Sequence, residues 1–239
     1  MKAAQHRHIA RRWPLVSGTV ALAVAAAVGL LVVLRESPLD LDADWMAEVI
    51  EHRSPYWQVP ALLMDRLGGG VVGVFVVPLG LVALLLLARR PWGALYSIVA
   101  AAASAGVVQL LKSLFARARP EDILVTADFG SFPSGHVANA ATVATTLIVL
   151  FGLVKGRGWV WMLGIAWVVM MALSRTYLGA HWVTDTLGGA LIGAAVAVIV
   201  WAPLAGRLAG EPRPRDGEGE PTGAARTPLT PAEGARPLA

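Results

Sequence analysis

The stretch "SRTYLGAHWVTD", Ser174–Asp185, places an arginine, a histidine and an aspartate between two long apolar segments. A charged residue at the centre of a membrane-spanning helix costs about 2.5–3.5 kcal/mol on an insertion scale, so such residues persist mainly where they have partners, water or a function. The flanking segments, Trp159–Ser174 and Trp182–Ala205, each predict a membrane helix. The polar stretch between them is therefore a candidate functional connection.

The composition is typical of a membrane protein. Of the 239 residues, 56% are hydrophobic and 15% charged, and the mean hydropathy is +0.62. The chain has no cysteine, which excludes disulfides, thiolate nucleophiles and cysteine metal sites. The net charge of +4 comes from basic residues at the ends of apolar segments, so it indicates membrane topology rather than nucleic-acid binding.

Six apolar segments are long enough to cross a bilayer, which requires about 20 residues at 1.5 Å rise per residue. They predict an all-α integral membrane protein with six transmembrane helices. The first begins with basic residues, as a signal peptide does, but its apolar run exceeds the usual length of about 7–15 residues, so we interpret it as a retained helix. The predicted spans are Trp13–Leu34, Leu67–Ala88, Trp92–Leu111, His136–Val154, Trp159–Ser174 and Trp182–Ala205.

Basic residues gather at four of the span ends, all on one predicted side of the membrane. The positive-inside rule assigns that side, and both termini with it, to the cytoplasm. The predicted organisation is a basic cytoplasmic N-terminus (1–12), a membrane domain (13–209) and a disordered cytoplasmic tail (210–239) rich in Pro, Gly, Glu and Arg. The basic residues are Lys2, Arg7, Arg11, Arg12, Arg89, Arg90, Lys155, Arg157 and Arg207.

The segment between the first two spans is acidic, so we expect it to face outward. Within it Trp45, Met46, Val49 and Ile50 recur at helical spacing. This pattern predicts an amphipathic helix on the outer membrane surface. A packing or capping role is an equally good interpretation.

The stretch "KSLFARARP" carries two cations on the predicted outer side. Lys112 and Arg119 are seven residues apart and lie nearly on one helical face, and Pro120 then ends the helix. Basic anchors at the membrane interface are the alternative, but these residues lie on the side that the positive-inside rule disfavours. We therefore expect both to bind an anion.

The stretch "FPSGH", Phe132–His136, immediately precedes the fourth span. The first turn of a helix has free backbone N–H groups at the positive end of its dipole, which favours phosphate binding. Ser134 alone is also consistent with an ordinary helix N-cap.

His181 and Asp185 are four residues apart, so on a helix the carboxylate can orient the imidazole toward a substrate. Such pairs also occur in purely structural networks. Arg175, near the outer end of the fifth span, can join Lys112 and Arg119 around a shared anion.

Together these positions resemble the three-part signature of the type 2 phosphatidic acid phosphatase superfamily. Every position of this signature is filled. Its first part is Lys112 with Arg119-Pro120, its second Pro133-Ser134-Gly135-His136, and its third Ser174-Arg175 with His181 and Asp185. The resemblance implies that His181 is a nucleophile forming phosphohistidine, that Asp185 fixes its tautomer, and that His136 is the general acid and base. It also implies phosphate binding by Lys112, Arg119, Arg175 and the amides of Ser134 and Gly135.

The resemblance further implies a multi-pass enzyme of the cell membrane, and the topology from the positive-inside rule places its site on the extracytoplasmic side. Its substrate would be a terminal lipid phosphate, as in phosphatidic acid, phosphatidylglycerol phosphate or undecaprenyl pyrophosphate. No cofactor or metal is expected, because the sequence has no carboxylate cluster for magnesium and no paired-histidine zinc motif. The alternatives are a vanadium haloperoxidase-like enzyme and a non-catalytic lipid-binding or transport protein. The oligomeric state stays open.

Overall fold

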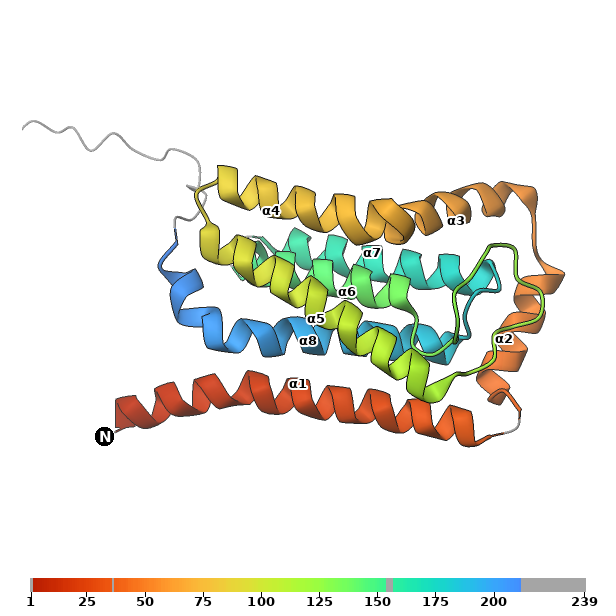
Figure 1. Cartoon of the computed structure of the whole chain (residues 1–239), viewed down its shortest axis with the longest axis horizontal. Coiled ribbons are helices and arrows are strands. Elements are labelled where there is room, and N and C mark those ends of the chain that lie inside the picture. The colour runs from red at the N-terminus through yellow and green to blue at the C-terminus, as the bar shows by residue number, and fades with distance from the viewer. Residues whose placement is uncertain (1, 36, 154–156, 212–239) are drawn as a thin grey trace, which may run out of the picture.

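The computed structural model describes residues 2–35, 37–153 and 157–211, with only the backbone path for residues 2–11. These residues form eight α-helices and two π-helical segments, and no strand occurs among them (Figure 1). Lys155 and the predicted tail from residue 212 lie outside the described residues. The elements are α1 (Lys2–Leu34), α2 (Asp40–Glu51), α3 (Pro55–Gly68), η1 (Val72–Val76), α4 (Val77–Leu87), α5 (Pro91–Phe115), α6 (Gly135–Leu147), η2 (Ile148–Gly152), α7 (Gly158–Tyr177) and α8 (Val183–Ala209).

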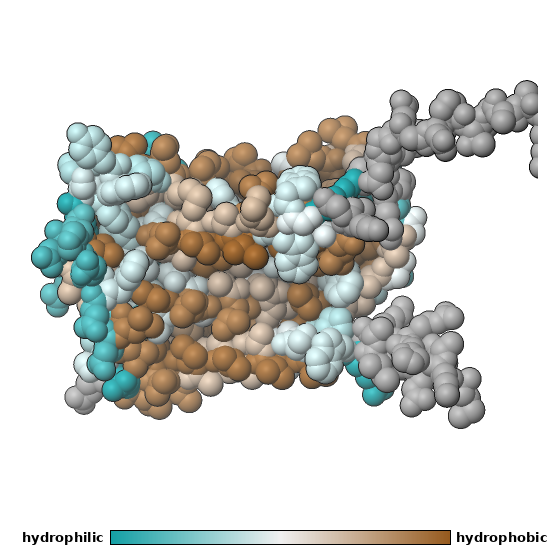
Figure 2. Space-filling model, turned by 180° about the vertical axis from the view of Figure 1, so that it is seen from behind, coloured by the Kyte–Doolittle hydropathy of each residue, from teal (hydrophilic) through white to brown (hydrophobic). Residues whose placement is uncertain are grey.

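Among the described residues, five helices are long and apolar enough to span a membrane, and α3 with η1–α4 makes a sixth span if this bent pair is counted as one. Hydrophobic residues cover the middle of the molecule, and hydrophilic residues gather at the end that carries α2 (Figure 2). The prediction of an all-α membrane fold is confirmed. The predicted fourth and fifth spans correspond to Gly135–Gly152 and Gly158–Tyr177.

The second predicted span differs from a straight helix. It begins earlier, at Pro55, and its two parts meet at an angle of 46° after Gly68. Gly70 there has a φ of +54°, a conformation that favours glycine. A Cβ at Gly73 would overlap the Gly68 carbonyl group, so the turn depends on the absence of side chains.

Helix α8 packs against α1, α5 and α6 and forms the centre of the bundle. Glycines permit its close approach to α6, because a Cβ at Gly189 would collide with the Ser134 carbonyl and one at Gly193 with the Ala138 carbonyl. The beginning of α8 is thereby held against the beginning of α6. This contact brings the second and third sequence motifs together.

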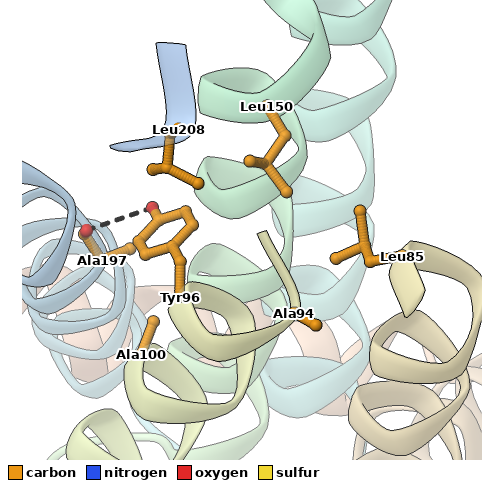
Figure 3. Close-up of a cluster of buried hydrophobic side chains, with 7 residues drawn as sticks. All are labelled: Leu85, Ala94, Tyr96, Ala100, Leu150, Ala197 and Leu208. Atoms are coloured by element: carbon orange, nitrogen blue, oxygen red, sulfur yellow. Dashed lines mark hydrogen bonds between the residues drawn. The ribbon is translucent and has the colours of Figure 1, made fainter. Parts of the chain in front are cut away.

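A hydrophobic cluster fills the bundle between α4, α5, η2 and α8 (Figure 3). The Tyr96 side chain lies within this cluster, and its hydroxyl donates a hydrogen bond to the Ala197 carbonyl at 3.1 Å. The buried members are Leu85, Ala94, Tyr96, Ala100, Leu150, Ala197 and Leu208.

A buried carboxylate joins the end of α8 to the beginning of α5. Glu211 accepts hydrogen bonds from the backbone N–H groups of Trp92 (2.5 Å) and Gly93 (3.2 Å). It also lies 3.4 Å from Arg90 Nε. A negative charge at a helix N-terminus is stabilised by the helix dipole, so this contact fixes the end of the bundle.

The two ends of the bundle carry different groups. At one end lie α2 and the connections between α5 and α6 and between α7 and α8; at the other lie the start of α1, the α4–α5 turn and the end of α8 (Figure 1). All three sequence motifs therefore meet at the α2 end.

Candidate active site

A cavity of about 670 Å³ lies at the α2 end of the bundle and extends between η1–α4 and α5. One part of it is charged, and its polar lining includes Lys112, Asp128, His136, Arg175 and His181. The remainder is apolar. The apolar lining includes Val74, Phe75, Pro78, Leu79, Ile98, Ala101, Ala102 and Ala105.

His181 lies in the α7–α8 connection and is only 2% exposed. Its Nδ1 is 2.8 Å from the Ser131 carbonyl oxygen, which can only accept a hydrogen bond. Nδ1 therefore carries the proton, and Nε2 is unprotonated with Arg119 Nη1 3.4 Å away. Burial lowers the pKa of His181 to about 4, so the imidazole is neutral at pH 7.

Asp185 is completely buried in the first turn of α8. Its Oδ2 is 3.6 Å from His181 Nδ1, so the predicted pair is present but the Ser131 carbonyl is the nearer acceptor. Ser131 Oγ and the Trp182 N–H donate to Oδ2, and Arg117 Nη1 donates to Oδ1 at 2.5 Å. Ser131 thus contacts both side chains: its hydroxyl donates to Asp185, and its carbonyl accepts from His181.

Lys112 and Arg119 converge on one acidic side chain in the α5–α6 connection. Lys112 Nζ donates to both carboxylate oxygens of Asp128 at 2.9 Å, and Arg119 Nη2 donates to Oδ1 at 2.7 Å. Partial burial favours the neutral acid, but Lys112 and Arg119 outweigh it and hold the pKa of Asp128 below its usual value. Arg119 Nη1 also lies 3.4 Å from His181 Nε2. Arg119 is therefore adjacent to the imidazole and shares Asp128 with Lys112. The prediction that the two cations lie on one helical face is wrong, because α5 ends at Phe115 and Arg119 follows in the connection.

His136 and Arg175 share a second acidic partner, Asp65 of α3. His136 Nε2 is 3.2 Å from both the carboxylate Oδ1 and the carbonyl oxygen of Asp65. Arg175 Nη1 forms an ion pair with the same Oδ1. The glycine break runs beside the imidazole, because a Cβ at Gly69 would overlap the ring of His136.

Ser134 is at the N-cap position of α6, yet its side chain makes no capping hydrogen bond. Within the described part of the chain, its buried hydroxyl and the buried Nε of Arg175 have no hydrogen-bond partner, which is unusual for buried polar atoms. The Ser134 N–H donates to the Asp185 carbonyl, so this amide is already engaged. The first helical hydrogen bond, from Ala138 N to Ser134 O, leaves the Gly135 N–H in the unpaired first turn.

Sequence reasoning missed five residues of this site. Arg117 stands inside the first motif but was not assigned a role, and Asp42 and Asp65 were counted only as charges of an outward segment. Asp128 and Ser131 lie in a connection with no recognisable pattern. The missed residues are Asp42, Asp65, Arg117, Asp128 and Ser131.

Two relatives are similar to parts of this chain. An undecaprenyl-diphosphatase of Sulfolobus acidocaldarius is 40% identical over 63 residues, which cover 26% of this chain and 28% of the relative. Phosphatidylglycerophosphatase B of Bacillus subtilis is 33% identical over 111 residues, which cover 44% of this chain and 55% of the relative. The matches thus span about a quarter to a half of each relative's length.

A solved structure resembles most of this chain. The crystal structure of the transmembrane PAP2-type phosphatidylglycerolphosphate phosphatase of Bacillus subtilis superposes with a TM-score of 0.67 at 25% identity. The superposition covers 79% of this chain and 94% of the other. The PAP2 superfamily matches residues 93–207, which contain all three motifs. Residues 93–207, which hold all three motifs, thus belong to the PAP2 superfamily.

Proposed function

We propose that this protein is an integral-membrane lipid phosphatase that removes a terminal phosphate, from a phosphomonoester or a diphosphate, through a phosphohistidine intermediate. The observation that carries the proposal is His181. Its protonated Nδ1 is held by the Ser131 carbonyl, which leaves Nε2 unprotonated beside Arg119, in a cavity that Lys112 and Arg175 also line. The relatives named as lipid phosphatases support this class of reaction.

In the first step, His181 Nε2 attacks phosphorus, the bond from phosphorus to the leaving oxygen breaks, and His136 gives that oxygen a proton. In the second, His136 takes a proton from water, the water oxygen bonds to phosphorus, and the P–N bond breaks. Inorganic phosphate leaves and His181 returns to its neutral form. Since His136 Nε2 faces two oxygens of Asp65, its Nδ1 is the nitrogen that exchanges this proton.

Charge stabilisation in this mechanism comes from cations around the phosphate oxygens. Lys112, Arg119 and Arg175 are assigned this role, and the Gly135 amide adds a donor. The unpartnered Ser134 hydroxyl and Arg175 Nε support it, because a phosphate supplies the acceptors that such buried donors require. The Ser134 amide, bound to the Asp185 carbonyl, is not part of the proposal.

The apolar part of the cavity supports a lipid as the substrate. A headgroup phosphate fits the charged part, and the lipid chain fits between η1–α4 and α5, where small side chains such as Ala101 and Ala105 leave room. A water-soluble phosphate ester would leave this apolar surface uncovered.

The site is further proposed to face the extracytoplasmic side. Arg12, Arg89, Arg90, Arg157 and Arg207 all lie near the opposite end of the bundle, as the positive-inside rule requires of a cytoplasmic end. On this orientation α2, with Trp45 and Ile50 partly exposed, lies at the outer membrane surface.

The test is phosphate release by the purified protein in lipid nanodiscs. Phosphatidic acid, phosphatidylglycerol phosphate and undecaprenyl pyrophosphate are supplied separately, and acid-labile 32P on the protein is measured after a quench. His181→Ala is expected to lose both signals. His52→Ala, at an exposed histidine of the same end, is the matched control and keeps both.

Three outcomes contradict the proposal. Full activity in His181→Ala removes the nucleophile, and lipid binding without phosphate release supports a non-catalytic role. Halide oxidation that depends on added vanadate supports a haloperoxidase.

EDTA tests the expectation of a metal-free reaction. Among the described residues, Glu48, Glu51 and His52 could together hold a metal ion, but they lie exposed on α2 and its end, and none lines the cavity.

A further inference from the structure

Helix α2 carries a buried carboxylate, that of Asp42, although a helix on the membrane surface can keep its charged side chains in water. Asp42 is in its first turn, and its side chain is fully buried, whereas its neighbour Asp44 is exposed. Burying a carboxylate is costly unless the group is paired and hydrogen-bonded. The partners of Asp42 therefore indicate what the helix does.

Those partners lie beside the candidate active site. Asp42 Oδ2 accepts hydrogen bonds from Arg117 Nη2 and from Thr184 Oγ1, both at 2.7 Å, and Oδ1 accepts one from the Thr184 N–H at 2.9 Å. Arg117 Nη1 then donates to Thr184 Oγ1 at 2.7 Å, which closes a ring of three residues. Every strong donor in this ring has an acceptor.

The ring continues directly into the group that orients the imidazole. Arg117 Nη1 donates to Asp185 Oδ1 at 2.5 Å, while Ser131 Oγ donates to the other oxygen, Oδ2. The Ser131 carbonyl accepts the hydrogen bond from His181 Nδ1. An unbroken series of contacts thus runs from α2 to the nucleophile: Asp42, Arg117, Asp185, Ser131 and His181.

The guanidinium group is fixed from several sides. It carries one positive charge between two buried carboxylates, Asp42 and Asp185, and it lies 5.6 Å from the ring of Trp182. Without Asp42, Nη2 of Arg117 and the Thr184 N–H both lose their acceptor, and Arg117 is free to turn. Asp185 and Ser131 then lose the contact that sets their orientation.

We propose that Asp42 and Arg117 are positioning residues, and that α2 takes part in catalysis by holding Asp185 and Ser131 in the arrangement that leaves His181 Nε2 free. This inference rests on the proposed function for its kinetic consequence, but its structural consequence can be measured without any turnover. Neither residue lines the cavity, so we expect neither to contact the substrate.

The kinetic experiment compares Asp42→Asn with Asp44→Asn on the exposed face of the same helix. A misplacement of reacting groups by about 1 Å costs on the order of 100-fold in rate, so Asp42→Asn is expected to lower kcat by roughly that factor with KM unchanged. Asp44→Asn is expected to match the parent protein. A rise in KM with normal kcat overturns the proposal.

A double-mutant cycle separates positioning from a general loss of structure. If Asp42 acts through Asp185, Asp42→Asn has little further effect on kcat in an Asp185→Asn background. The same loss in both backgrounds overturns the proposal. If Asp42→Asn fails to fold, Arg117→Lys replaces it in the cycle, since lysine keeps the charge but lacks the second donor.

The structural readout is the tautomer of His181, measured by 15N NMR of the histidine-labelled protein in nanodiscs. The parent protein is expected to give one Nδ1-protonated form, and Asp42→Asn a mixture of tautomers. An unchanged tautomer in Asp42→Asn overturns the inference. This measurement needs no phosphatase activity. It therefore distinguishes failure of the positioning role of Asp42 from failure of the proposed function.

Discussion

The carboxylate of Asp128 lies on the ammonium group of Lys112, with both oxygens 2.9 Å from Nζ. Asp128, in the α5–α6 connection, thus forms an ion pair with Lys112, which is one of the cations proposed to bind the phosphate. Asp128 is 59% exposed, whereas Lys112 is almost completely buried. The aspartate can therefore turn toward water, while the lysine stays in the cavity.

Asp128→Asn is expected to strengthen binding of phosphate-like anions, because it removes a competing negative charge from Lys112 and Arg119. As the carboxylate is largely exposed and screened, we expect a gain of only roughly 2- to 5-fold. The measurement is the inhibition constant of vanadate. Asp122→Asn, at an exposed position of the same connection, is the control; equal constants in all three proteins would falsify the competition.

The protonation of His181 gives a pH prediction. Burial lowers its pKa to about 4, so its NMR signal is expected to stay constant from pH 8 to about 5 and to change near pH 4. The unfolded chain binds that proton near pH 6.5, so the free energy of unfolding decreases as the pH falls between these values. His181→Asn identifies the signal. Titration near pH 6.5 contradicts the buried neutral imidazole.

Gly69→Ala is expected to move His136 without unfolding the protein. The added Cβ overlaps the outer edge of the imidazole, which can swing away, whereas the surrounding backbone has no need to shift. We expect kcat to fall by at least about 10-fold with a normal melting temperature. Gly80→Ala in α4, where no heavy atom lies within 4 Å of the new Cβ, is the matched control. Unaltered kcat in Gly69→Ala argues against His136 as the acid.

Glu211→Ala tests the opposite end of the bundle. It removes the acceptor of the Trp92 and Gly93 amides and the partner of Arg90. Hydrogen bonds to charged groups contribute about 1.5–3 kcal/mol, which corresponds to a Tm lower by roughly 3–12 °C. Scanning fluorimetry measures the shift, with the exposed Glu51→Ala as control. Loss of kcat at a temperature where the variant is folded is the contrary result.

The absence of cysteine makes the sidedness of the protein simple to measure. Ser37→Cys lies at the α2 end and Ala88→Cys at the opposite end, and both positions are exposed. If the site faces outward, a membrane-impermeant maleimide labels Ser37→Cys in intact cells and labels Ala88→Cys only after lysis. The reverse pattern places the site in the cytoplasm.

The fold was largely predictable because membrane spans leave a strong apolar pattern. The bend after Gly68 was not, since glycines are common in membrane helices and their spacing does not reveal an angle. The motif residues were also predictable, because each type has a distinct chemistry. Their partners were not: Asp42 and Asp65 are far from the motifs in sequence, and only the packing of α2 and α3 brings them to Arg117 and His136.

The cavity combines a cluster of cations with an apolar channel between η1–α4 and α5. A detergent with an alkyl chain and a phosphate or sulfate headgroup offers the same two features as the proposed substrate. Alkyl sulfates and phosphocholine detergents should therefore act as competitive inhibitors during purification. Neutral maltosides lack the anion, and they are the better choice for extracting the protein with its site free.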